Sequence, residues 1–149
     1  MIHFKKTDSS DRDFQKLVNL LDADLAIRDG DDHAFYDQFN KIANIKNVMV
    51  AYMEGEAVGC GAFKEWEDGL VEIKRMYVSP TKRNRGIAHQ LLTHLETWAK
   101  ELNYKGCVLE TGINQPEAIR LYEKAGYHRI ENYGQYKNVM TSICMKKDF

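Results

Sequence analysis

A basic loop at residues 79–88 contains the residue types that bind a phosphate group. Its sequence, SPTKRNRGIA, ends where apolar residues begin to recur at helical spacing. The first turn of a helix leaves backbone N–H groups without partners and carries a partial positive charge, and Gly86 would let an anion approach that backbone closely. Lys82, Arg83 and Arg85 add positive charge, and an arginine can hold phosphate with two hydrogen bonds. The alternative is a solvated surface loop, and the flanking segments decide against it.

The segments on either side of this loop predict a strand and a helix. Residues 70–78 are rich in β-branched and aromatic residues and end before Pro80, which is typical of a strand. Apolar residues at helical spacing predict a helix over 87–102, and residues 107–111 predict another strand. The loop matches neither the dinucleotide fingerprint G-x-G-x-x-G nor the P-loop G-x-x-x-x-G-K-[ST]. Neither of these nucleotide sites is therefore predicted.

Two separate motifs stand in the second half of the chain. The first is V-x-P at 78–80 followed by R-x-x-G-x-A at 83–88, and the second is QPEAIRLYEKAGY at 115–127. In this order they resemble two motifs of the GCN5-related N-acetyltransferase (GNAT) family, [Q/R]-x-x-G-x-[G/A] and N-x-x-A-x-x-L-Y-x-x-x-G-[F/Y]. The resemblance covers about residues 48–146. Gln115 stands where the family usually has asparagine.

This resemblance implies acetyl-CoA as the cosubstrate and indicates which residues would bind it. The backbone of Met76 and Val78 is expected to pair with the pantetheine amides, and backbone N–H groups of residues 83–88 to hold the pyrophosphate. The contact usually made by the family's asparagine could come from Gln115 or from the adjacent Asn114. The expected cofactor-binding residues are Met76, Tyr77, Val78, Arg83, Asn84, Arg85, Gly86, Ile87, Ala88, Asn114 and Gln115.

Acetyl transfer from a thioester to an amine needs a proton donor for the departing thiolate, and Tyr122 is the expected acid. Tyr122 belongs to the second motif, and on a helix over 117–125 it falls on the same side as Gln115 and the small Ala118. The structural alternative is a half-buried helix tyrosine whose hydroxyl bonds to the backbone.

The same reaction needs a base for the ammonium proton, and Glu72 is the expected one. The segment from Glu72 to Val78 resembles the E-I-x-x-C-x-I strand of histone acetyltransferases, in which that glutamate accepts the proton through water. The alternative is a solvent-facing Glu72 paired with Lys74 or Arg75. Glu65 and Glu110, each at the end of a predicted strand, are the reserve bases.

The composition indicates one soluble domain over residues 1–149. Of the 149 residues, 44% are hydrophobic, and the net charge of -1 disfavours nucleic-acid binding. The absence of a long apolar run and of a signal-like start leads us to expect a cytoplasmic protein that does not bind membranes. The five histidines show no metal-ligand spacing, so no metal is expected. Three cysteines without C-x-x-C spacing are expected to be small core residues: Cys60, Cys107 and Cys144.

The order of predicted elements, β-α-α-β-β-β-α-β-α-β-β, indicates an α/β fold. Hairpins in the first half and a β-α-β crossover in the second predict a mixed, mostly antiparallel twisted sheet of about seven strands, flanked by about four helices. The resemblance implies the same acyl-CoA N-acyltransferase-like architecture. The strands are predicted at 2–6, 48–53, 58–66, 70–78, 107–111, 127–132 and 139–145. The helices are predicted after a cap at Ser9 or Ser10, around Phe35, Phe39 and Ile42, over 87–102, and over 117–125.

We expect an N-acetyltransferase in which a primary amine of a small molecule or peptide attacks the thioester directly, because no activated cysteine is evident. The family usually builds the acceptor wall from residues here numbered 22–36 and 132–138. The turn Tyr133–Tyr136 would shape the pocket or merely cap the last hairpin. The main alternative function is a non-catalytic acyl-CoA-binding module, and a homodimer is left open. An acidic cluster would suit a cationic acceptor, unless it is simply solvated: Asp22, Asp24, Asp29, Asp31 and Asp32.

Overall fold

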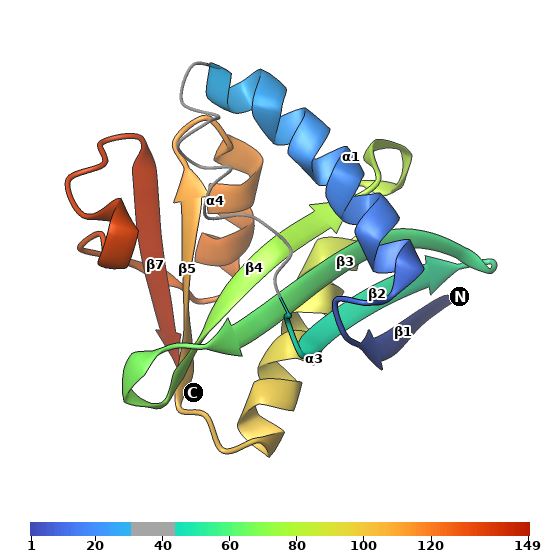
Figure 1. Ribbon diagram of the computed structural model, residues 1–149, viewed down its shortest axis with the longest axis horizontal. Helices are drawn as coiled ribbons and strands as arrows, with labels where there is room; N and C mark the ends of the chain where they lie inside the picture. The colour runs from blue at the N-terminus through green and yellow to red at the C-terminus, as the bar shows by residue number, and fades with distance from the viewer. Residues whose placement is uncertain (31–43) are drawn as a thin grey trace.

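In the computed structural model, which describes residues 1–30 and 44–149, the strands form one seven-stranded sheet with the order β1-β2-β3-β4-β5-β7-β6 (Figure 1). Neighbouring strands are antiparallel except β4 and β5, which are parallel, and this confirms the predicted mixed sheet. The strands are β1 (Ile2–Thr7), β2 (Asn47–Met53), β3 (Glu56–Glu65), β4 (Leu70–Val78), β5 (Gly106–Gly112), β6 (His128–Ile130) and β7 (Ser142–Asp148). The described helices are α1 (Arg12–Asp29), α3 (Ile87–Glu101) and α4 (Pro116–Lys124). The helix expected around residues 35–42 lies outside the described residues.

Helices cover both faces of the sheet, with α1 in front of it and α3 behind it in Figure 1. Phe14, Leu17 and Val18 of α1 pack on one face, in a cluster with Val48 and Cys60. The apolar residues of α3 and α4 pack on the other face, in a second and larger cluster. Burial on both faces explains why the central strands are apolar nearly throughout.

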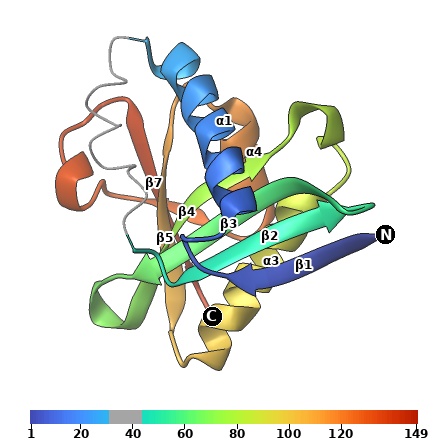
Figure 2. The ribbon, with the colours of Figure 1, turned by 45° about the vertical axis from the view of Figure 1, so that its right-hand side comes forward.

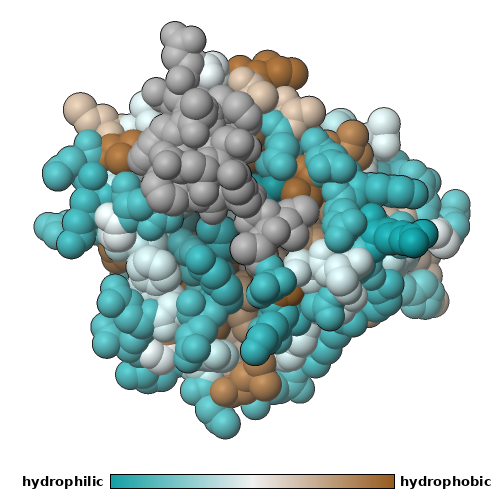
Figure 3. Space-filling view, viewed as in Figure 1, coloured by the Kyte–Doolittle hydropathy of each residue, from teal (hydrophilic) through white to brown (hydrophobic). Residues whose placement is uncertain are grey.

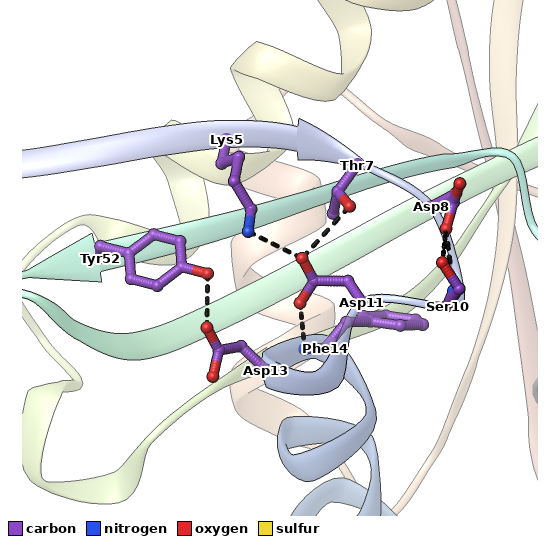
Figure 4. Close-up of polar contacts among 8 residues, drawn as sticks. All are labelled: Lys5, Thr7, Asp8, Ser10, Asp11, Asp13, Phe14 and Tyr52. Carbon is purple, nitrogen blue, oxygen red and sulfur yellow. Dashed lines mark hydrogen bonds and ion pairs between the residues drawn. The ribbon is translucent and has the colours of Figure 1, made fainter.

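The start of α1 is fixed by Asp11, shown in Figure 4. Its carboxylate accepts a hydrogen bond from the backbone N–H of Phe14 at 3.0 Å and lies 2.8 Å from Lys5 Nζ. The predicted cap at Ser9 or Ser10 is therefore wrong. Ser10 donates to Asp8 instead, and the hydroxyl of Ser9 accepts from the N–H of Ile45.

The last two strands differ from their predicted ranges. The strand expected at 127–132 is limited to His128–Ile130, and the strand expected at 139–145 runs over Ser142–Asp148. Between them, Gly134–Tyr136 form a 3-10 turn, and Asn132 Nδ2 donates to two carbonyl groups farther along the chain. These local hydrogen bonds use backbone groups that a longer hairpin would need.

The surface seen in Figure 3 is largely hydrophilic, with hydrophobic residues scattered in small patches. In the part of the chain that the structure describes, no helix has the length and apolar character needed to cross a membrane.

Candidate active site

The strands β4 and β5 diverge along their length, as Figures 1 and 2 show. The two strands are paired only between Leu70–Glu72 and Gly106–Val108. Beyond these residues the strands border a cleft of about 810 Å³. The bend of β4 has a local cause, because its register with β3 shifts opposite Cys60–Ala62 and Arg75 adopts a φ of 60°. Such a bulge bends a strand and increases its twist.

The predicted phosphate loop borders one end of this cleft. Gly86 adopts a φ of 77° at the start of α3, a conformation that favours glycine, and no side chain caps this helix. Arg83 donates from Nε to the carbonyl of Val78 at 2.9 Å and lies over the ring of Tyr77. Its side chain is thus held against the end of β4. Among the predicted cofactor-binding residues, those that line the cleft are Met76, Tyr77, Val78, Arg83, Asn84, Gly86, Ile87, Ala88 and Gln115.

Two predicted cofactor-binding residues, Arg85 and Asn114, are not part of the cleft lining. Arg85 is exposed on the loop and is not part of the cleft lining. Asn114 donates from Nδ2 to the carbonyl of Arg28 at 3.3 Å, whereas its neighbour Gln115 lines the cleft. Of the two amides that the sequence left open, Gln115 is therefore the one that lines the cleft.

Tyr122 lines the cleft from α4 and is 6% exposed. Its ring packs edge-on against Tyr127, with ring centroids 5.7 Å apart. Burial raises the pKa of the Tyr122 hydroxyl, and the nearby charge of Glu110 raises it further. The hydroxyl therefore stays protonated at neutral pH, as a proton donor requires.

Glu72 also lines the cleft but is only 2% exposed, so it does not face solvent, although it does pair with Lys74 as the alternative expected. Tyr133 donates from its hydroxyl to Glu72 Oε2 at 2.7 Å. The other oxygen, Oε1, forms ion pairs at 3.6 Å with Lys74 and at 4.0 Å with Lys64. Trp66 packs on the ring of Tyr133, with ring centroids 4.9 Å apart, and fixes this donor.

Glu110 lines the same cleft from β5. Burial raises the pKa of its carboxyl to about 7, and the negative charges of Asp29 and Glu72 add to this rise. A hydrogen bond with Ser142 and the positive charge of Lys74 lower the pKa and offset part of the rise. Its Oε2 is buried without a hydrogen-bond partner in the described residues. The other reserve base, Glu65, is exposed and is not part of the cleft lining.

Three charged residues of α1 line the cleft: Asp24, Arg28 and Asp29. Asp22 pairs with the buried Arg75 at 2.5 Å, and Asp24 pairs with Arg28 at 3.3 Å. Arg28 also pairs with Glu117 at the start of α4, so one arginine joins two walls of the cleft. Two carboxylates of the acidic cluster are thus engaged by the protein's own cations, and Asp31 and Asp32 lie outside the described residues.

Sequence reasoning missed Arg75 and Arg28 as cleft residues. Arg75 enters the site because of the bulge in β4, and the bulged strand itself carries no glycine there, although Gly61 stands opposite the bulge on β3. Arg28 is brought there by the length and direction of α1. The aromatic turn was recognised, and it does shape the pocket through Tyr136, which lines the cleft.

The three cysteines are free and buried, which confirms their prediction as core residues. Burial raises the pKa of Cys60 to about 12 and that of Cys144 to about 11, so neither thiol is an activated nucleophile. Among residues 1–30 and 44–149, no group of three or more His, Cys, Asp or Glu side chains could hold a metal ion.

Comparison with known proteins gives related sequences and a related structure. Residues 14–127 match the family described as Acetyltransferase (GNAT) family. An IAA acetyltransferase of Azospirillum brasilense is 38% identical over 66% of this chain and 65% of its own length, so the match spans less than two thirds of that relative. The uncharacterised N-acetyltransferase YsnE of Bacillus subtilis is 29% identical over 98% of this chain and 99% of its own. A crystal structure from Klebsiella pneumoniae, described as an acyl-CoA N-acyltransferase, is 31% identical with a TM-score of 0.83 and covers 99% of this chain and 97% of its own.

Proposed function

The chain belongs to the GNAT family of acetyltransferases, and from that premise we propose that it transfers the acetyl group of acetyl-CoA directly to a primary amine. One observation carries this proposal. The uncapped start of α3, the edge of β4 that β5 leaves unpaired, and Tyr122 all border one cleft.

Each part of the cleft suits one part of the reaction. Backbone N–H groups at the start of α3 would hold the pyrophosphate. The edge of β4 beyond Glu72 has no strand partner in the described residues, so it can pair with the pantetheine amides as an added strand would. Tyr122 would protonate the thiolate. Its raised pKa makes it a weak acid, so its position next to the sulfur must supply most of the benefit.

The acceptor would enter from the α1 side, where carboxylates and cations alternate along the cleft. We propose a small molecule or a peptide with a free amine as the acceptor. The name of one relative, an IAA acetyltransferase, is compatible with a small-molecule acceptor.

The test is the release of free CoA thiol when the protein is incubated with acetyl-CoA and a panel of amines, amino acids and peptides. We expect at least one acceptor to raise thiol release well above the rate without acceptor, with the acetylated amine detected by mass spectrometry. If acetyl-CoA binds but no member of the panel raises thiol release, the chain would be a non-catalytic acyl-CoA-binding module.

A further inference from the structure

The position of Glu110 follows from the strand register. The parallel pairing of β4 and β5 ends at Glu72 and Val108, and Glu110 stands two residues beyond Val108, at the wall of the open cleft. On the same strand, Cys107 and Leu109 pack in the cluster on the α3 side of the sheet. Because successive side chains of a strand point to opposite faces, Glu110 points to the α1 side.

Tyr122 reaches the cleft from the opposite face. Its ring belongs to the cluster on the α3 side, together with Leu109 and Tyr127. Tyr122 therefore lines the cleft from the α3 side of the sheet and Glu110 from the α1 side. An acceptor bound along α1 would lie on the side of the Glu110 carboxyl.

Glu72 also points to the α1 side, because Val71 and Ile73 pack in the cluster on the α3 side, but its position in the sheet and its partners differ from those of Glu110. It stands where β4 and β5 are still paired, before the cleft widens. Tyr133 donates to its Oε2, and its Oε1 forms ion pairs with Lys64 and Lys74 but, like Glu110 Oε2, has no hydrogen-bond partner in the described residues. Tyr133 and the protein's own cations therefore surround the Glu72 carboxylate.

We propose that Glu110, rather than Glu72, is the general base of the reaction, an inference that rests on the proposed acetyl transfer. The ammonium proton of the acceptor moves to the Glu110 carboxylate, and the freed nitrogen lone pair attacks the thioester carbonyl carbon. The carbon–sulfur bond then breaks, and the sulfur takes the proton of the Tyr122 hydroxyl. The nitrogen then carries one proton more than the neutral amide, and this proton moves to the Tyr122 oxygen and restores the hydroxyl. Glu110 releases its proton to solvent, so one proton is produced for each acetyl group transferred.

The groups around Glu110 set the pH at which it works. Burial is the main influence on its carboxyl, and it places the pKa at about 7, where a base can both accept and release a proton. Glu110 interacts electrostatically or by a hydrogen bond with groups on α1, β4, α4, the aromatic turn and β7. These groups are Asp29, Glu72, Lys74, Tyr122, Tyr136, Ser142 and Cys144.

The experiment is the pH profile of kcat/KM for the wild type, Glu110→Gln and Glu72→Gln, with an amine accepted in the thiol-release assay. Glu56→Gln, at an exposed position of β3 outside the cleft lining, is the matched control. The wild type and the control should rise to a plateau through an apparent pKa near 7. Glu110→Gln should lose about 10²-fold or more at pH 7 and keep rising until the amine itself deprotonates. Glu72→Gln should keep the rise of kcat/KM near pH 7, which we call the limb of the profile.

A limb near pH 7 that persists in Glu110→Gln would overturn the inference while leaving acetyl transfer intact. Absence of turnover in the wild type with every amine would instead count against the proposed function. Stabilisation by acetyl-CoA shows whether each variant is folded. If Glu110→Gln does not fold, Glu110→Asp replaces it, and it should keep the limb at a lower rate because it retains a carboxyl group.

Discussion

At the scale of single residues, burial acts on Tyr122 and Glu110 in the same direction with opposite chemical results. It raises the pKa of both groups. The tyrosine, which already titrates above neutral pH, becomes a permanent donor. The glutamate, which would be fully ionised on a surface, reaches about 7 and can exchange its proton. Environments that give two titratable groups different protonation states at one pH are how a site assigns its acid and its base.

Tyr122→Phe keeps the ring contact with Tyr127 and removes only the hydroxyl. We expect kcat to fall by about 10²-fold or more, with little change in acetyl-CoA affinity, because the loss affects protonation of the thiolate. Steady-state kinetics and calorimetry check the two parts separately. A kcat within twofold of the wild type would make Tyr122 a packing residue.

Glu110→Gln should also change the dependence of stability on pH. The folded protein holds the Glu110 proton more tightly than the unfolded chain, since the pKa rises from 4.5 to about 7. The free energy of unfolding therefore falls as the pH rises from about 4.5 to about 7, by up to about 3 kcal/mol. Glu110→Gln should lack this decline, which urea unfolding at several pH values measures. Parallel curves for the two proteins would show that Glu110 has an ordinary pKa.

At the scale of elements, the two long helices begin in different ways. In the first turn of α1, the N–H of Phe14 has a side-chain partner, because the carboxylate of Asp11 accepts its hydrogen bond (Figure 4). The start of α3 at Gly86 has no side-chain cap. Backbone donors at a helix start need partners from side chains, water or a ligand. The start of α1 therefore stabilises the fold through its cap, whereas the start of α3 has backbone donors that can bind an anion.

Gly86→Glu tests the anion site, with Gly86→Ala as its matched control. A Cβ at this position meets only Gln90, at 3.9 Å, but the φ of 77° costs any L-residue roughly 1–2 kcal/mol. Both variants share that cost, whereas only glutamate places negative charge where the pyrophosphate would bind. By calorimetry we expect Gly86→Ala to bind acetyl-CoA and Gly86→Glu to lose at least tenfold in affinity. Equal affinities would move the phosphate site elsewhere.

Asp11→Ala removes the cap of α1 without touching the cleft. Its carboxylate also pairs with Lys5, and hydrogen bonds from Lys5 and Phe14 outweigh the effect of burial and lower its pKa. The free energy of unfolding should fall by about 1 kcal/mol at pH 7, as for other caps replaced by alanine. Asp11→Asn, which keeps an acceptor oxygen, should lose less. A loss of stability in Asp11→Asn as large as in Asp11→Ala would assign the effect to the charge.

At the scale of the whole molecule, the sequence predicted the sheet and the phosphate loop because both depend on local patterns. The β-branched and aromatic strand segments, the helical spacing after Gly86 and the motif around Tyr122 are all visible within short windows of sequence. The sequence could not rank the three candidate bases, Glu65, Glu72 and Glu110. Their ranking depends on where the pairing of β4 and β5 ends and on the groups that surround each carboxyl. The late start of β7 was missed for a similar reason, since hydrogen bonds from Asn132 compete with the strand.

Acetyl-CoA should stabilise the folded domain as a whole, because the proposed cleft draws on β4, β5, α1, α3 and α4 together. A ligand that binds only the native state adds about 2.7 kcal/mol at a hundredfold excess over its dissociation constant. For a domain of this size that corresponds to a rise in melting temperature of roughly 5–10 °C. ATP offers phosphates to the start of α3 but has no pantetheine arm to pair with the free edge of β4, so it should raise the melting temperature much less. Thermal unfolding with each ligand at matched concentration measures the difference. An equal rise with ATP would show that the loop binds phosphate in general, and that the gap between β4 and β5 contributes nothing to recognition of the cosubstrate.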